Sequence, residues 1–159
     1  MPQLDYNDQN AIPAVKGGLA DSAFHDIVGG NAAVDINFGY GLAVTAVEGV
    51  VALPAAAGFI FAGVAVQSLK DIPRSTGVAL YEADEEFPIL RKGRIWVYSE
   101  QAVNPTLAVF LRHTVNATLV PGDFRVDIDT ANAQDISAFA KWRSTTTAAG
   151  LAILEVNAP

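Results

Sequence analysis

Alternation of apolar and polar residues is clearest in the middle of the chain. Apolar residues recur at every second position over residues 94–98 and again over residues 107–112. A period of two places alternate side chains on opposite faces of a sheet, so each stretch predicts a strand. Lys92-Gly93 separates the first stretch from the apolar run at residues 87–90, and a two-residue turn ending in glycine is typical of a hairpin. The pattern therefore predicts a strand, a turn at Lys92-Gly93, a second strand and, after a short connection, a third.

A similar alternation runs from residue 34 to residue 44. Its larger apolar residues share one face, and small or polar residues occupy the other. The pattern predicts a half-buried strand whose second face, with Gly39 and Gly41, is small enough for another backbone to approach. The two glycines lack the third glycine and the following helix of a phosphate-binding loop, so no nucleotide site is expected there.

Residues 49–69 carry no charge, and their number is close to the ~20 residues that a membrane-spanning helix needs. Pro54 and three glycines interrupt this stretch, and most of its apolar residues are alanine. We therefore predict buried strands over residues 49–53 and 59–66, and no membrane span.

Further short strands are predicted over residues 78–81, 124–128, 136–143 and 151–156. Turns rich in glycine, proline and aspartate separate them, and no stretch combines helix caps with a 3.6-residue apolar stripe. Many short strands joined by such turns favour an all-β fold. We predict an antiparallel β-sandwich or jelly-roll-like domain over residues 23–157.

Residues 1–22 show no sustained periodicity and predict an extended N-terminal arm. Prolines, glycines and spaced apolar residues alternate along it, and its first ten residues lack the features of a secretory signal. The apolar spacing favours docking on another surface, with a disordered tail as the alternative. The candidate anchors are Leu4, Tyr6, Ile12 and Val15.

The charge balance limits the partners that the protein can have. Ten Lys and Arg residues against seventeen Asp and Glu residues give a formal net charge of −7, which disfavours binding to nucleic acid or to an anionic membrane surface. Only 17% of the residues are charged, below the usual ~25%, so much of the surface is neutral and suited to packing against protein partners. The absence of cysteine excludes disulfides and thiolate metal sites.

The sequence shows no catalytic or cofactor-binding constellation. His25 and His113 are far apart, have no metal-ligand spacing, and are interpreted as surface or turn residues. Residues 127–135 resemble a calcium loop at first sight but lack its required glycine and its final glutamate, which leaves a looser calcium site as the alternative to a polar connection. We predict a protein without enzymatic activity, cofactor or metal.

The densest basic cluster consists of Arg91, Lys92 and Arg94, at the tip of the predicted hairpin. On an acidic protein, three positive charges at one turn can steer it toward an acidic partner surface. The alternative is a set of solvated charges that protect the turn. The acidic run at residues 82–86 is interpreted as a solvated loop.

Taken in order, several stretches resemble tailed-bacteriophage capsid cement, or decoration, proteins. Each motif alone is weak, and the resemblance rests on their joint order over residues 14–157. The stretches are AVKGGLADS (14–22), FGYGLAV (38–44), FAGVAVQ (61–67), PILRKGRIWVYSEQAVNP (88–105), PGDFRVD (121–127) and AKWRSTTTAAGLAILEVN (140–157).

The resemblance implies a non-enzymatic virion protein on the outer surface of the capsid, where it would join neighbouring major capsid proteins and associate with itself as a dimer or trimer. A different class remains as the alternative, namely a β-sandwich that binds a carbohydrate or a receptor. That function would require Trp96, Tyr98 and Trp142 to form an exposed stacking platform.

Overall fold

The computed structural model describes residues 14–21, 24–68 and 80–159. These residues form strands and turns without a helix, so the predicted all-β class is confirmed, and none of them belongs to a helix able to cross a membrane. The strands are β1 (Asp26–Ala32), β2 (Ile36–Asn37), β3 (Gly41–Val44), β4 (Val50–Ala52), β5 (Phe61–Ala65), β6 (Leu80–Tyr81), β7 (Glu86–Ser99), β8 (Phe110–Arg112), β9 (Phe124–Arg125), β10 (Ala133–Asp135), β11 (Ala140–Trp142) and β12 (Gly150–Asn157).

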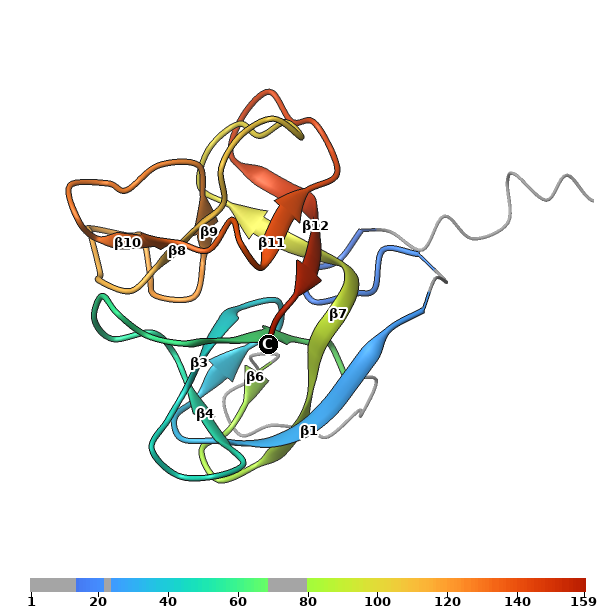
Figure 1. Cartoon of the computed structure of the whole chain (residues 1–159), viewed down its shortest axis with the longest axis vertical. Coiled ribbons are helices and arrows are strands. Elements are labelled where there is room, and N and C mark those ends of the chain that lie inside the picture. The colour runs from blue at the N-terminus through green and yellow to red at the C-terminus, as the bar shows by residue number, and fades with distance from the viewer. Residues whose placement is uncertain (1–13, 22–23, 69–79) are drawn as a thin grey trace, which may run out of the picture.

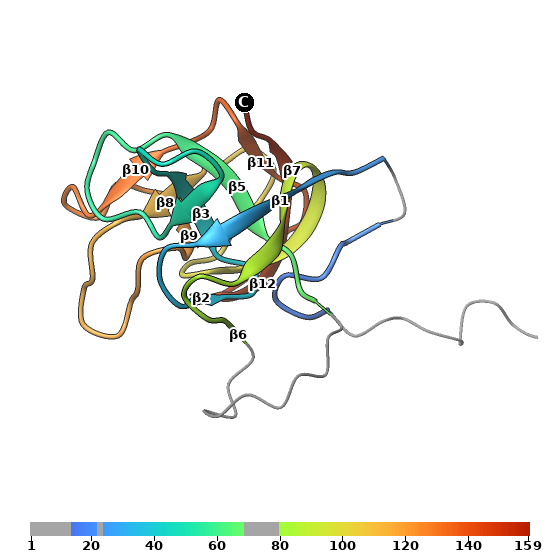
Figure 2. The same cartoon turned by 90° about the horizontal axis from the view of Figure 1, so that it is seen from below.

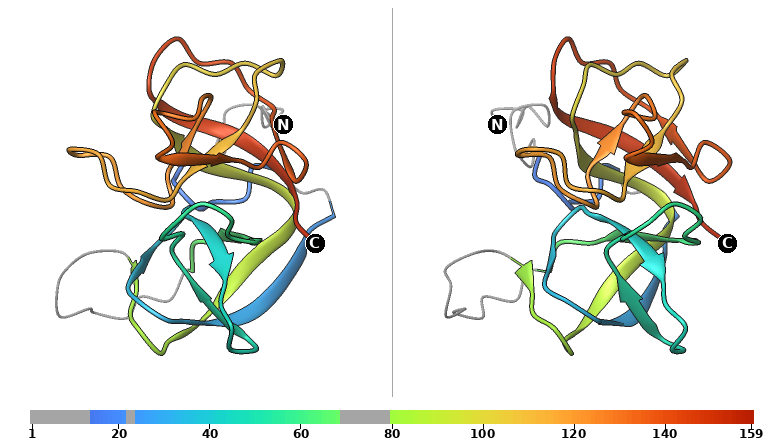
Figure 3. Two further views of the ribbon diagram at one scale, coloured as in Figure 1. Left: turned by 60° about the vertical axis from the view of Figure 1, so that its left-hand side comes forward. Right: turned by 90° about the vertical axis from the view of Figure 1, so that its left-hand side faces the viewer.

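Five strands form a barrel-like ring, in which β1 and β4 pair at two residue positions only. Around it, β1 pairs with β7, β7 with β5, β5 with β3, β3 with β4, and β4 returns to β1. Figure 3 shows this ring as the lower body of the molecule. One apolar cluster belongs to it, and its buried members are Ala32, Ile36, Tyr40, Leu42, Val51, Ala65, Tyr81, Phe87 and Ile89.

The second half of β7 leaves the ring and builds the other body of the molecule (Figure 1). There β7 pairs with β12, β12 with β11, and the short strands β8, β9 and β10 pair in the order β9–β8–β10. The larger apolar cluster joins this body to the ring. Its bulkiest buried members are Trp142, Phe61, Phe124, Leu90, Ile95, Leu111, Ile136 and Leu154.

The sheet is mixed, so the prediction of a purely antiparallel architecture is wrong. The β1–β4 pair is parallel at Asn31↔Val50 and Ala32↔Val51, and β7 meets β9 in parallel at Ser99↔Phe124. β4 runs antiparallel to β3 and parallel to β1, and its pairing with β1 joins the two ends of the ring. The sandwich or jelly-roll arrangement is not confirmed by this topology.

The predicted hairpin turn at Lys92-Gly93 is wrong, because β7 runs through it as one 14-residue strand. Gly93 has a φ of 134°, and a Cβ placed on it would lie 2.4 Å from the His25 ring. The glycine therefore serves the close approach of a neighbouring chain segment, not a reversal. Around this position β7 exchanges β1 for other partners, and Figure 2 shows its curved course beside β1 and β12.

The strand predicted over residues 34–44 is interrupted. A turn separates β2 from β3, and Gly39 has a φ of 72°. A Cβ on Gly39 would lie 2.7 Å from the backbone nitrogen of Gly17, so the predicted approach of another backbone to this small face is confirmed. Val34, which precedes β2, and Val44, the last residue of β3, are exposed, so the predicted buried face does not extend over the whole stretch.

The uncharged stretch at residues 49–69 contains β4 and β5, which confirms the prediction of strands there. The third strand of the central region is shorter than predicted, because β8 begins only at Phe110. Asn104 closes a turn before it, with its side-chain Oδ1 accepting a 2.9 Å hydrogen bond from Thr106 N–H and its carbonyl accepting one of 3.2 Å from Leu107 N–H.

Residues 14–21, from the predicted arm, pair with the second half of β7. Gly17 N–H donates to Trp96 O at 2.7 Å, Trp96 N–H donates to Gly18 O at 2.8 Å, and Ala20 N–H donates to Arg94 O at 2.9 Å. These bonds complete the edge of β7 opposite β12. The end of the predicted arm that the structure describes is thus part of the sheet.

Candidate functional site

The structure places one of the four predicted arm anchors. Leu4, Tyr6 and Ile12 lie outside the described residues. Val15 is half-buried, and its carbonyl accepts a 2.9 Å hydrogen bond from Gly18 N–H. Val15 therefore stands at the point where the chain turns onto the domain.

Lys16 holds this turn in place. Its Nζ lies 2.8 Å from Asp123 Oδ1 and 3.7 Å from the centre of the Tyr40 ring. Burial lowers the pKa of Lys16 and raises the pKa of Asp123, whereas the attraction between the two charges opposes both shifts. Because each charge has lost most of its water, each depends on the other for compensation.

The basic cluster does not form one patch. Arg91, Lys92 and Arg94 lie within β7, not at the tip of a hairpin. The Arg91 guanidinium donates a hydrogen bond to the carbonyl oxygen of Pro159, and Ala158 N–H donates to Arg91 O at 2.8 Å. Arg91 therefore anchors the end of the chain.

The other two basic residues differ in their ion pairing. Arg94 Nε donates to Glu155 Oε2 at 3.0 Å, and its Nη1 donates to Asp21 Oδ2 at 3.3 Å. Lys92 is exposed and forms no ion pair with any residue in the described ranges. Of the three predicted contacts, Lys92 is the one whose charge is most open to a partner.

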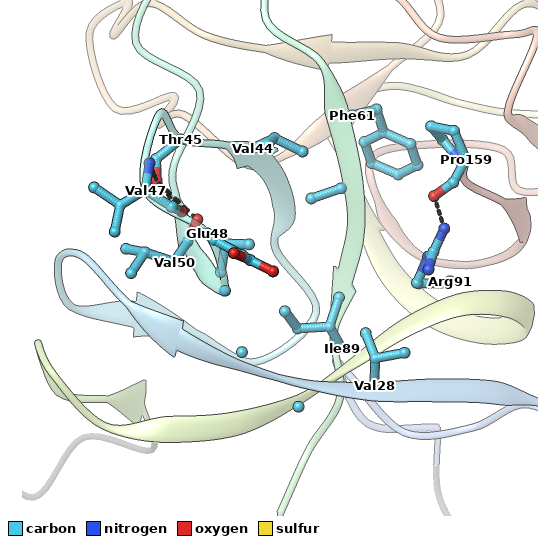
Figure 4. Close-up of a pocket in the computed structure, with 15 residues that line it drawn as sticks. Val28, Val44, Thr45, Val47, Glu48, Val50, Phe61, Ile89, Arg91 and Pro159 are labelled. Carbon is cyan, nitrogen blue, oxygen red and sulfur yellow. Dashed lines mark hydrogen bonds between the residues drawn. The ribbon is translucent and has the colours of Figure 1, made fainter.

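A pocket of about 390 Å³ opens at one end of the ring of strands (Figure 4). The glycine-rich strand β1, the β3–β4 turn, β5 and the C-terminal residue Pro159 surround it. Its walls are mainly apolar, formed by Val28, Val44, Val47, Val50, Phe61 and Ile89. The charged lining residues are Glu48, on the β3–β4 turn, and Arg91, which bonds to Pro159. Sequence analysis did not predict this pocket, because the ring closure that forms it joins distant segments.

A buried ion-pair network joins β7, β8 and β9, and it was also missed. The buried side chain of Glu100 accepts hydrogen bonds from Arg112 Nε at 2.5 Å and from Arg125 Nη1 at 2.7 Å. Asp129 Oδ2 lies 2.5 Å from Arg112 Nη2 and 3.1 Å from Arg125 Nη1, and Arg125 also pairs with Asp127. The hydrogen bonds to Glu100, followed by those to Asp129, raise the pKa of Arg112.

The network explains the acidic stretch that resembles a calcium loop. Hydrogen bonds from Gln101 and Arg125 lower the pKa of Asp127, and hydrogen bonds from Arg112 and Asn116 lower the pKa of Asp129. Their carboxylates thus serve as counterions of arginines. The sequence did contain a signal for this network: Arg112 and Arg125 each end a short strand, and an aspartate-rich loop follows the second strand.

Neither histidine belongs to a reactive cluster. Asp21 Oδ1 lies 3.6 Å from His25 Nε2. His113 is buried directly after β8, so its interpretation as a surface or turn residue is wrong. Burial lowers the pKa of His113. Within residues 14–21, 24–68 and 80–159, no group of three or more His, Asp or Glu side chains is arranged to hold a metal ion.

The three-ring platform required for a carbohydrate-binding module does not form. Trp142 is fully buried, and its Nε1 donates a 3.1 Å hydrogen bond to Ala108 O. Trp96 and Tyr98 are half-buried in β7. Because a stacking platform needs exposed ring faces, this alternative loses the feature on which it depended.

Comparison with known proteins identifies the class. The model of the family described as "Structural cement protein (E217 gp24/Pam3 gp6)" matches residues 1–157. Among solved structures, a chain from "The capsid of Myoviridae Phage XM1" has the same fold, with a TM-score of 0.68 and 16% sequence identity over 99% of this chain and 98% of that one. No curated protein sequence matches.

The match over nearly the whole chain shows that it belongs to the family of phage structural cement proteins. The family is described as one of structural cement proteins, which is not an enzyme class, and the resemblance noted in the sequence is confirmed.

Proposed function

We propose that this protein binds the outside of the capsid shell and cements neighbouring major capsid proteins, without enzymatic activity. The observation that carries the proposal is the family match over residues 1–157, which extends through both the arm and the domain. Cementing means adding contacts between shell subunits that the internal pressure of packaged DNA would otherwise separate.

The surface supports a role in packing against proteins. Only 17% of the residues are charged, and several large apolar side chains are exposed in the described part of the chain. The most exposed are Phe24, Val47, Ile60, Val115 and Ile128. Each such contact contributes roughly 25 cal/mol per Å² of apolar surface buried, and repetition over a lattice multiplies weak contacts through avidity.

The contacts are proposed to come from the arm and from the basic residues of β7. Leu4, Tyr6 and Ile12 would dock on the shell, with Val15 at the hinge of the arm. Arg91, Lys92 and Arg94 would face an acidic partner surface, and Lys92 is the strongest of these candidates because its charge is not already paired in the described structure. Self-association as a dimer or trimer belongs to the same proposal.

Reconstitution on shells that lack the protein tests this function. The purified protein is mixed with such shells, and bound protein is quantified after sedimentation together with the temperature at which the shells rupture. The proposal expects saturable binding at a fixed ratio to the major capsid protein and a higher rupture temperature. Absence of binding, or binding that leaves the rupture temperature unchanged, would contradict it.

A further inference from the structure

β7 pairs with one edge of β1, and the register shows which residues of β1 hydrogen-bond along that edge. Gly29 lies opposite Pro88, which has no N–H to donate. Ala32 N–H donates to Glu85 O at 3.0 Å on the same side. Since backbone groups alternate in direction along a strand, the even-numbered residues of β1 bond to β7, and the odd-numbered residues face away from it.

The other side of β1 is paired only at its end. Asn31 N–H donates to Gly49 O at 2.8 Å, and β4 pairs with Asn31 and Ala32 alone. Within the described ranges, no strand pairs with the outward N–H and C=O groups of Ile27 and Gly29. The ring of strands therefore has an open seam along the first half of β1.

The open seam borders the pocket at the end of the ring. At Gly29 and Gly30 the wall of the pocket is backbone without side chains. Val44, Val47 and Val50, from the β3–β4 hairpin, add apolar surface. Figure 4 shows these valines along the β3–β4 hairpin, whose strand β4 pairs with the end of β1. An unpaired strand edge beside an apolar trough is the arrangement that proteins use to accept an added strand.

We propose that an extended peptide segment of the shell protein adds to the open edge of β1 and lays apolar side chains into this pocket. The inference rests on the proposed function, because it names the shell protein as the source of the segment. The peptide backbone would bond to Ile27 and Gly29, and alternate side chains would contact the valines of the hairpin.

Charge complementarity identifies the segment further. In Figure 4 the Glu48 carboxylate points into the pocket, and Glu48 forms no ion pair with any residue that the structure describes. The cationic group opposite, Arg91, is already bonded to the C-terminal residue. The occupant therefore carries a Lys or Arg beside its apolar residues. The first 13 residues of this chain contain no Lys or Arg, which disfavours the arm of a second copy as the occupant.

Hydrogen exchange of individual amides tests the strand addition. In the free full-length protein, the amides of Ile27 and Gly29 are expected to exchange about tenfold or more faster than those of Val28 and Gly30. On reconstituted shells, all four should exchange slowly. Fast exchange of Ile27 and Gly29 in shell-bound protein would overturn the inference while leaving the proposed function standing, since binding itself is measured in the same sample.

Charge reversal tests the polarity of the segment. Glu48→Lys is expected to weaken shell binding about fivefold to tenfold, with the melting temperature unchanged. Glu82→Lys, an equal change at another exposed glutamate, is the matched control and should bind like the unaltered protein. An unaltered affinity for Glu48→Lys would contradict the proposed cationic occupant.

A cross-link identifies the occupant. The chain has no cysteine, so Val47→Cys gives a single attachment point for a benzophenone photo-cross-linker at the rim of the pocket. The expected product is a peptide of the major capsid protein that contains Lys or Arg. Cross-linking to the N-terminal residues of a second copy, or no cross-linking in fully bound shells, would overturn the assignment.

Discussion

Lys16 Nζ lies 2.8 Å from Asp123 Oδ1, and this pair ties the base of the N-terminal arm to a turn 107 residues later in the chain. Tyr40 covers the ammonium group from one side. The pair fixes the start of the described N-terminal segment, because Gly17 and Gly18 continue directly from Lys16 into hydrogen bonds with β7. Residues 16–20 are therefore held by the folded domain.

Removing one partner of this pair is expected to destabilise the protein. Lys16→Met leaves the Asp123 carboxylate largely buried without its cation, which should lower the free energy of unfolding by about 2–3 kcal/mol. Urea unfolding measures the change. The double variant Lys16→Met, Asp123→Leu should lose less than the sum of the single losses, and strict additivity would show that the two residues are not coupled.

Gly93 is expected to resist substitution because β7 passes His25 closely at that point. Gly93→Ala must adopt a φ near 134° and displace the His25 ring from a 2.4 Å approach, so a loss of about 2–3 kcal/mol is expected in urea unfolding. Gly150→Ala is the control for the contact, since its φ of 159° is also positive but its Cβ would meet nothing within 4 Å. Equal stability of the two variants would refute this role of Gly93.

The same position shows where sequence reasoning succeeds and fails. Period-two alternation correctly predicted that alternate side chains lie on opposite faces of a strand: Ile95 and Val97 are buried, and Trp96 and Tyr98 are more accessible. Lys92-Gly93 has the composition of a turn, but the close passage of His25 decides its conformation. A contact between segments 68 residues apart in sequence leaves no mark in a local pattern.

The candidate site was predictable to a similar extent. The basic cluster was found, yet its division into a paired Arg91, a paired Arg94 and an open Lys92 depends on Pro159, Glu155 and Asp21, which tertiary structure brings to β7. The Arg112–Glu100 network was missed for the same reason. The family could be predicted from the sequence because the resemblance rests on the order of motifs along the chain.

Stability should fall on acidification as the arginine network loses its anions. Hydrogen bonds hold the pKa values of Asp127 and Asp129 below their ordinary range, so the unfolded state binds protons first as the pH decreases. The stabilisation is complete above about pH 5 and is lost as the pH falls through about 4 toward the lower folded-state values. Urea midpoints measured from pH 6 to pH 3 test this sign.

Asp129→Asn provides the control for the acid transition. This variant cannot ionise at residue 129, so its urea midpoint should start lower at pH 6 and decline less toward pH 3 than that of the unaltered protein. Parallel pH profiles for the two proteins would show that Asp129 does not contribute to the acid sensitivity.

Deletion of residues 1–13 is expected to weaken attachment to shells without unfolding the domain. The deletion ends before Val15 and Lys16, so it preserves the hydrogen bonds and the ion pair that hold the base of the arm. Sedimentation with shells should show at least about a tenfold loss of affinity, given the apolar area of three anchors. Full affinity in the truncated protein would contradict the role of Leu4, Tyr6 and Ile12.

The position of the protein on a reconstituted shell tests the central claim most directly. Electron cryo-microscopy of shells before and after addition of the purified protein would show the density that it contributes. The account predicts all-β density on the outer surface, over the contacts between neighbouring major capsid proteins. Density on the inner surface, or density confined to a single capsid subunit with no neighbour in contact, would contradict it.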